Sequence, residues 1–237
     1  MGNKNSKANH LETAQKTGCC TLSKMGLEEL PPDLFKINII RSLDISQNKL
    51  HNLPQGLGRL TNLKMLNLSF NRITALDQTL ISKWTKLENL IAHSNSISQM
   101  PKFPMLRHLK SLDFSNNVLT SISTSVYSLP QLDMLNLQNN KITSIPEENI
   151  QKLYCVEINL NQNQINRLPS AIKKCERLKV LRIEENCLES ISSEILADSK
   201  IAVLHIGGNI LTEKDLRETD GYEKYSQRFT ESKRKAD

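Results

Sequence analysis

The chain has 237 residues, a formal net charge of +6 at neutral pH, 38% hydrophobic residues and only 4% aromatic residues. No run of about 18 apolar residues occurs, so the sequence predicts no transmembrane helix, and the polar N-terminus lacks the apolar segment of a secretory signal. The five cysteines are odd in number and scattered, which favours a reducing, intracellular compartment over a disulfide framework. They are Cys19, Cys20, Cys155, Cys175 and Cys187.

Residues 1–16 carry the first candidate site. Met1-Gly2, followed by Ser6 and then Lys7, matches the N-myristoylation pattern. We therefore predict a lipidation arm with a C14 chain on Gly2 after removal of Met1, and a short helix over residues 8–16. The prediction makes a membrane surface one partner of the chain. The alternative is an accidental match in a disordered tail.

The segment 132–142, Leu-Asp-Met-Leu-Asn-Leu-Gln-Asn-Asn-Lys-Ile, organises the rest of the chain. It has the spacing L-x-x-L-x-L-x-x-N-x-L, which is the signature of a leucine-rich repeat. An asparagine in the same frame recurs every 22 to 24 residues. The eight positions are Asn48, Asn71, Asn95, Asn117, Asn140, Asn163, Asn186 and Asn209. Eight repeats in one register predict a single α/β-type leucine-rich repeat solenoid over residues 17–211, with a curved parallel β-strip on its concave side and irregular or 3-10 segments on its convex side.

Each repeated residue type has a physical function. The leucines alternate with the period of a strand, so they point inward and are buried only when neighbouring coils stack on them. The asparagine stands where the strand turns into the return path. Its amide can both donate and accept, so it can satisfy backbone groups of two adjacent coils, which aspartate cannot do. We therefore predict a structural asparagine ladder.

The first coil, residues 17–31, is degenerate. With Met25 in the asparagine position, Cys20, Leu22 and Leu27 occupy core positions and Cys19 faces outward. Palmitoylation of Cys19 or Cys20 is an alternative that would supply a second membrane signal, but core packing already explains Cys20.

Residues 212–237 break the repeat and predict a helical C-terminal cap with a basic tail. Thr212 and Asp215 resemble a helix-opening capping box, and Gly221 weakens the middle of the segment. Apolar residues at near-helical spacing predict a face that covers the core of the last coil. They are Leu216, Tyr222, Tyr225 and Phe229.

The outward positions of the strands provide the candidate binding residues on the concave face. They are Asp44, Met65, Asn67, Ile91, Asp113, Met134, Asn136, Asn159, Arg182 and His205. This surface consists mainly of amides and hydroxyls with a few apolar points, and the basic residues lie along its rims. Phosphate tracking needs clustered Lys and Arg, so we expect a protein partner of unknown identity and no nucleic acid. Catalytic, cofactor-binding and metal-binding motifs are absent, so we predict no catalytic residues, no metal and no cofactor, and we expect a monomer.

The 23-residue repeat with its closing (L/I)-P resembles that of the intracellular leucine-rich repeat family, which includes Ras-pathway scaffolds and phosphatase regulators. Residues 10–18, 181–188 and 216–225 are further similar to one member of that family. The resemblance implies a non-enzymatic, lipid-anchored protein with its lipid site at Gly2. Because a single myristoyl chain binds membranes only marginally, we expect the protein to be divided between membrane and cytosol. The resulting hypothesis is a membrane-tethered scaffold that binds protein on its concave face. The alternative is a regulator of a signalling enzyme, in a protein phosphatase or small GTPase pathway, acting through the same surface.

Overall fold

The computed structural model describes residues 2–234, and the side chains from residue 8 onward. The predicted removal of Met1 and the last three residues of the tail lie outside this range. The chain divides into two compact units, Met1–Val118 and Leu119–Asp237. The boundary falls inside the repeat array, where the sequence predicts one continuous solenoid. Each coil of a solenoid contacts only its neighbours, so a long array has no core that would tie distant coils together.

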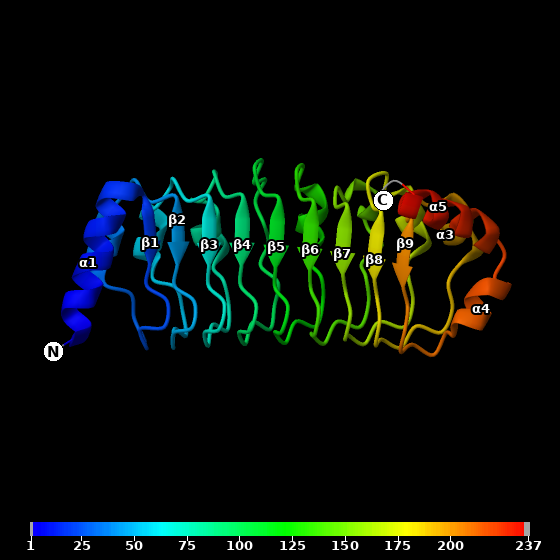
Figure 1. The fold of residues 1–237 in the computed structure, drawn as a ribbon, viewed down its shortest axis with the longest axis horizontal. Helices are drawn as coiled ribbons and strands as arrows, with labels where there is room; N and C mark the ends of the chain where they lie inside the picture. Colours follow the sequence, from blue (N-terminus) through cyan, green and yellow to red (C-terminus); the bar gives the residue numbers. More distant parts are fainter. Residues whose placement is uncertain (1, 235–237) are drawn as a thin grey trace. The chain divides into compact units, whose positions relative to one another are not determined.

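The first unit contains one N-terminal helix and five parallel strands that pair in chain order (Figure 1). The elements are α1 (Gly2–Thr17), β1 (Cys19–Thr21), β2 (Ser42–Asp44), β3 (Met65–Asn67), β4 (Asn89–Ile91) and β5 (Ser111–Asp113). The middle residue of every strand points inward and is buried, and these residues align from strand to strand. They are Cys20, Leu43, Leu66, Leu90 and Leu112. The predicted register of the repeat is confirmed.

The second unit has four parallel strands with the same alignment. They are β6 (Met134–Asn136), β7 (Glu157–Asn159), β8 (Val180–Arg182) and β9 (Val203–His205). Their buried middle residues are Leu135, Ile158, Leu181 and Leu204. Each burial contributes about 1.5–3 kcal/mol only because the next coil covers it.

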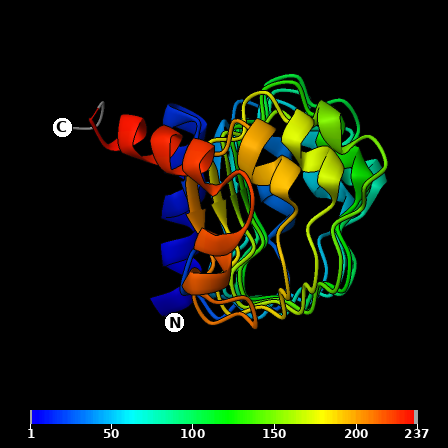
Figure 2. The same cartoon turned by 90° about the vertical axis from the view of Figure 1, so that its right-hand side faces the viewer.

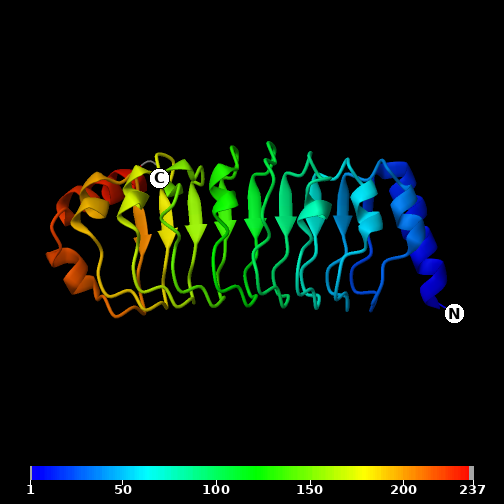
Figure 3. The same cartoon turned by 180° about the vertical axis from the view of Figure 1, so that it is seen from behind.

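The return paths run behind the strands (Figure 3) and are mostly 3-10 turns, as predicted. These turns are η1 (Pro32–Lys36), η2 (Gln55–Arg59), η3 (Thr124–Ser128), η4 (Ile150–Lys152) and η5 (Ser170–Lys174). Two return paths differ from the prediction, because they form short α-helices, α2 (Gln78–Ile81) and α3 (Ser193–Asp198). At α2 the carboxylate of Asp77 accepts a hydrogen bond from the Thr79 amide at 2.7 Å and caps the helix.

The ladder asparagines connect adjacent coils through backbone groups. At Asn163, the side-chain oxygen accepts from the Ile142 amide at 3.0 Å. Its Nδ2 donates to the carbonyls of Leu137 and Leu160, both at 3.0 Å. The other seven ladder asparagines each accept from a backbone amide of the preceding coil, and their Nδ2 groups also donate to main-chain carbonyls. In the first coil Met25 has no side-chain amide to take the place of asparagine, and the backbone N–H groups of Met25 and Leu27 both donate to Asn48 Oδ1.

The residue before each ladder position has a left-handed backbone conformation. These residues are Lys24, Gln47, Phe70, Ser94, Asn116, Asn139, Gln162, Glu185 and Gly208. Asn and Gly adopt this conformation readily, whereas a bulky aromatic residue with φ +53° is an outlier that indicates strain. Phe70 is therefore the unusual member of this series.

The helix α1 covers the first coil. It extends from Gly2 to Thr17 and is longer than the short helix predicted over residues 8–16. It ends at Gly18, which has φ +73° and donates its N–H to the Ala14 carbonyl at 2.9 Å. Ala14 is fully buried, so the last turn of α1 packs on the first coil.

The C-terminal segment covers the last coil with two helices, α4 (Glu213–Glu218) and α5 (Tyr222–Arg234), of which α5 packs on α3 (Figure 2). The predicted capping box of Thr212 and Asp215 opens α4. The helices separate at Gly221, which has φ +87° and leaves no room for a Cβ, because that atom would lie 2.8 Å from the Ser193 carbonyl oxygen. Tyr225 accepts a hydrogen bond from the Leu204 amide at 3.2 Å, and Arg228 donates to the carbonyls of Leu196, Ala197 and Ile201.

Candidate protein-binding surface

The candidate surface, here called the strand face, consists of the first and third residue of each strand together with the residue two positions beyond. All ten predicted binding residues lie on the strand face of their unit. Met65 and Met134 are the most open of them, with exposed fractions of 37% and 46%. The other eight are half-buried.

The Asp and Asn side chains in the third position of the strands have a structural function that the sequence analysis missed. In each case the side-chain oxygen accepts a hydrogen bond from the backbone amide two residues on, at 2.9–3.2 Å. These residues are Asp44, Asn67, Asp113, Asn136 and Asn159. Such Asx turns satisfy amides at the end of the strand. The recurring Asp or Asn at one repeat position is the signal that could have revealed them.

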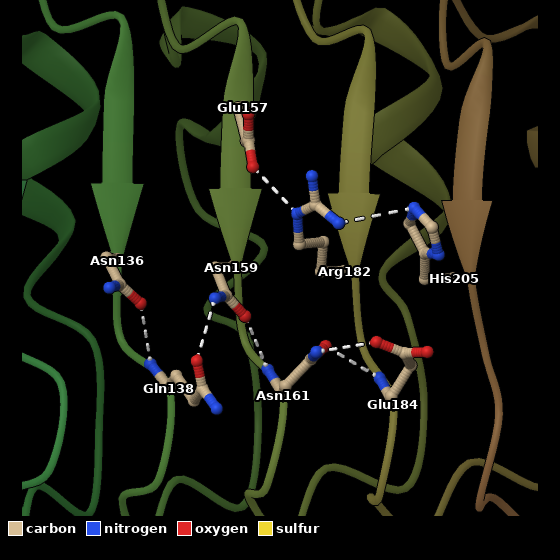
Figure 4. A network of polar contacts seen from close by, with 8 residues as sticks. All are labelled: Asn136, Gln138, Glu157, Asn159, Asn161, Arg182, Glu184 and His205. Carbon is tan, nitrogen blue, oxygen red and sulfur yellow. Dashed lines mark hydrogen bonds and ion pairs between the residues drawn. The ribbon is translucent and has the colours of Figure 1, made fainter.

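A polar network crosses β7, β8 and β9 in the second unit (Figure 4). Arg182 Nε donates to Glu157 Oε1 at 2.7 Å. Arg182 Nη1 lies 3.3 Å from His205 Nε2. A guanidinium can only donate, so this contact requires His205 Nε2 to accept and the ring proton to be on Nδ1. Arg182 is thus held between two strands by side chains on both sides.

A second row of contacts lies beside the first (Figure 4). Asn159 Nδ2 donates to Gln138 Oε1 at 3.1 Å, and Asn161 Nδ2 donates to Glu184 Oε2 at 2.7 Å. Arg182 has no oxygen for an Asx turn, and the Glu184 amide donates to Asn161 Oδ1 on the neighbouring coil at 2.9 Å instead. The amides and carboxylates of this unit are therefore fixed in position before any partner binds.

In the first unit an exposed aromatic residue lies beside the strand face. Phe70 is 53% exposed, and its ring meets the His93 ring edge-on with 5.0 Å between the centroids. Sequence analysis did not single out Phe70, although an aromatic residue in a position otherwise held by polar residues or glycine is a signal for it. On the opposite rim Glu88 contacts Lys64 at 2.9 Å and Lys110 at 3.1 Å. The hydrogen bonds from Lys64 and Lys110, with their charges, hold the pKa of Glu88 below its usual value.

Reactive chemistry is not apparent in the described part of the chain. Among residues 8–234 no group of three His, Cys, Asp or Glu side chains is arranged to hold a metal ion. Burial raises the pKa of the Cys20 thiol to about 11 and that of Cys175 to about 12, so both are poor nucleophiles at neutral pH. An open groove where β9 meets the cap is lined by His205, Tyr222 and Phe229 among others. Within residues 2–234 no helix has the length and apolar composition of a membrane-spanning segment.

Stacked coils with parallel strands, an internal asparagine ladder and a polar outer strand face define a repeat solenoid. Known proteins agree with this class. Residues 21–73 and 38–97 match the family described as "Leucine rich repeat", and residues 107–151 match "Leucine Rich repeats (2 copies)". These matches together cover about half of the sequence, and the chain belongs to the leucine-rich repeat family.

Similar solved structures share this fold. A leucine-rich repeat protein of Leptospira interrogans is 27% identical over 84% of this chain, with a TM-score of 0.73. The leucine-rich repeat domain of APL1B is 20% identical over 91% of this chain, with a TM-score of 0.70, and shows the fold alone. The plant peptide hormone receptor RGFR1, solved in complex with RGF2, is 25% identical over 76%, with a TM-score of 0.59. The chain spans only 50%, 65% and 34% of these three proteins, respectively.

Proposed function

We propose that this protein is a non-enzymatic scaffold that binds a protein partner on its strand face and is tethered to a membrane by a myristoyl group on Gly2. The observation that carries the proposal is the polar network around Arg182. The Arg182 side chain contacts Glu157 on one neighbouring strand and His205 on the other before any partner binds. Preorganised side chains lose little conformational entropy when a partner binds. The exposed methionines Met65 and Met134 add adaptable apolar contacts beside this polar surface.

Two further facts support the proposal. The receptor RGFR1, which shares the fold, was solved in complex with RGF2, so a leucine-rich repeat scaffold of this kind can hold another molecule. For the membrane, the pattern Met1-Gly2 with Ser6 provides an acceptor glycine. A single myristoyl chain gives an association constant of only about 10⁴ M⁻¹, so we expect the protein to be divided between membrane and cytosol.

Photo-crosslinking tests the binding surface. A photoreactive amino acid at Met134 on the strand face should crosslink a protein partner in cells, whereas the same amino acid at Ser128 on the return path of the same unit should not. Both positions are exposed, so the comparison reports which face is used. Crosslinks gained mainly at Ser128 would contradict the proposed surface. If the captured protein is a phosphatase or a small GTPase, the scaffold acts as a regulator of that enzyme.

Intact-mass measurement tests the tether. Protein isolated from eukaryotic cells should lack Met1 and carry the mass of one C14 acyl group. Gly2→Ala keeps an α-amine but removes the N-terminal glycine that myristoylation requires, so the membrane-bound fraction should become soluble. An unmodified or acetylated N-terminus would refute the tether and would leave the protein-binding proposal to be judged by the crosslinks.

A further inference from the structure

The start of α1 and the loops that follow the first three strands lie at the same edge of the first unit (Figures 1 and 3). The helix α1 runs antiparallel to β1, so Gly2 is placed at the edge toward which the strands point. Cys19 lies at the opposite end of α1, about 24 Å away for a helix of this length. An acyl group on Gly2 would therefore emerge beside these loops and far from Cys19.

The same loops hold most of the exposed positive charge of this edge. We call residues 24–28, 47–51 and 70–74 the basic edge. Lys24, Lys49 and Arg72 are exposed there, and none of them forms an ion pair with another described side chain. Glu28 is the only acidic residue within the basic edge, and the exposed Glu29 follows it directly, so the three cations exceed these two carboxylates by one. The corresponding loops of the next two coils, residues 94–98 and 116–120, carry no charged residue, so within the first unit the positive charge of these loops is confined to the first three coils.

Phe70 completes the basic edge with an exposed aromatic ring. The repeat imposes a left-handed backbone conformation at this position in every coil, and Phe70 is the only aromatic residue among those that adopt it. Aromatic side chains are also favoured at the boundary between membrane and water. Two lysines of the N-terminal arm, Lys4 and Lys7, add positive charge to the same end of α1 by sequence.

We propose that the basic edge is a docking surface for an anionic phospholipid membrane and acts together with the acyl chain on Gly2. This inference rests on the proposed tether. A single myristoyl chain binds a membrane only weakly, and stable anchoring requires a second signal such as a basic patch. The basic edge would supply this second signal. With the basic edge on the membrane, the strands β1–β3 point toward the lipid and their strand face remains open to a protein partner.

Vesicle co-sedimentation of the full acylated chain tests the proposal. Acylation is verified by intact mass, and binding is measured on phosphatidylcholine vesicles with and without phosphatidylserine. The double variant Lys49→Glu, Arg72→Glu should lower the partition onto phosphatidylserine vesicles at least roughly 30-fold, because each cation near an anionic surface contributes about 1 kcal/mol. Binding to pure phosphatidylcholine, which reads the acyl chain alone, should not change.

The matched control is Lys83→Glu, Arg59→Glu, which makes the same charge change at exposed positions on the return path of the same unit. It should retain most of the binding to phosphatidylserine vesicles. Equal losses in the two double variants would overturn the basic edge and leave only a general charge effect. Unchanged binding in the Lys49, Arg72 variant would also overturn it and would leave a protein as the occupant of that edge.

Phe70→Asn gives a second, independent reading. Asparagine adopts the left-handed conformation easily, so the thermal midpoint should stay level or rise, while binding to phosphatidylserine vesicles should fall several-fold. A fall in both stability and binding would indicate a structural function for Phe70.

If acylated protein binds phosphatidylcholine no better than unacylated protein, the tether fails. The difference between the two kinds of vesicle would still report on the basic edge.

Discussion

Replacing Asn163 by alanine should destabilise the second unit more than an ordinary polar substitution does. The change removes the acceptor of the Ile142 amide and one of the two side-chain donors of each of the Leu137 and Leu160 carbonyls. The Asn161 carbonyl, a weaker partner at 3.2 Å, still accepts from the Asn139 amide. The Leu137 carbonyl keeps the Asn140 Nδ2 group as a donor, and the Leu160 carbonyl keeps that of Asn186. One buried backbone group, the Ile142 amide, is then left without a protein partner, at a cost of about 1–3 kcal/mol.

We expect the loss for Asn163→Ala to be about 1–3 kcal/mol, because the Ile142 amide loses its acceptor while both carbonyls keep one donor each. Asn163→Asp keeps the acceptor for Ile142 but loses both donor bonds and brings a negative charge toward two carbonyl oxygens. Its loss at neutral pH should be at least as large. Gln164→Ala is the control, because Gln164 is the exposed next residue and should change stability by less than about 0.5 kcal/mol.

Urea unfolding followed by circular dichroism measures the free energies, and hydrogen exchange at the Ile142 amide reads the lost bond directly. In the parent this amide should be protected, and in Asn163→Ala it should exchange with the fast class. An unfolding free energy within about 0.5 kcal/mol of the parent, or unchanged protection of Ile142, would refute the reasoning that the ladder stabilises coils through backbone groups.

Three further predictions concern the cap, a surface carboxylate and the thiols. Arg228→Ala should destabilise the second unit by about 2–4 kcal/mol in urea unfolding, because three carbonyls around α3 lose their donor, whereas exposed Lys224→Ala should have almost no effect. The Glu88 carboxylate should titrate by NMR with a midpoint below 4.5. Its stabilising contribution should be complete above pH 4.5 and should be lost as the pH falls through the lowered pKa. The double variant Lys64→Ala, Lys110→Ala should return the midpoint toward 4.5. In the native protein a maleimide should modify the exposed Cys19 and Cys187, while Cys20, Cys155 and Cys175 should react only after unfolding; early reaction of Cys155 would contradict its complete burial.

The strands were predictable because the repeat specifies them many times over. Each strand lies at a fixed distance before its asparagine, so an error in one coil would have been corrected by the others. The extent of α1 was not predictable in the same way, since its first half has no apolar periodicity. Gly18, which follows the last residue of α1, was the sequence signal for the end of the helix. The α-helical return path α2 was also missed, because the Asp77 cap that favours it lies in a coil only one or two residues longer than its neighbours.

The strand face shows a different limit. The sequence identifies which residues point outward, but it cannot say how their atoms are used. Asp44 and Asn67 each accept a hydrogen bond from a nearby backbone amide with one oxygen, so only part of the side chain remains for a partner. The cross-strand bonds of Arg182 depend on Glu157 and His205, which are far apart in the sequence and meet only because the coils stack in register.

The hydrogen bonds of the ladder asparagines that join one coil to the next end on main-chain atoms, and this has a consequence for how such a protein can change. A main-chain amide or carbonyl is the same whichever side chain it carries, so the joint between two coils does not depend on the residues displayed outside. Duplicating a coil of 23 residues within one unit would therefore create a new joint with the same partners as the old one. The protein can lengthen or exchange its outward surface by whole coils, because the bonds that hold a coil in place are indifferent to what it presents.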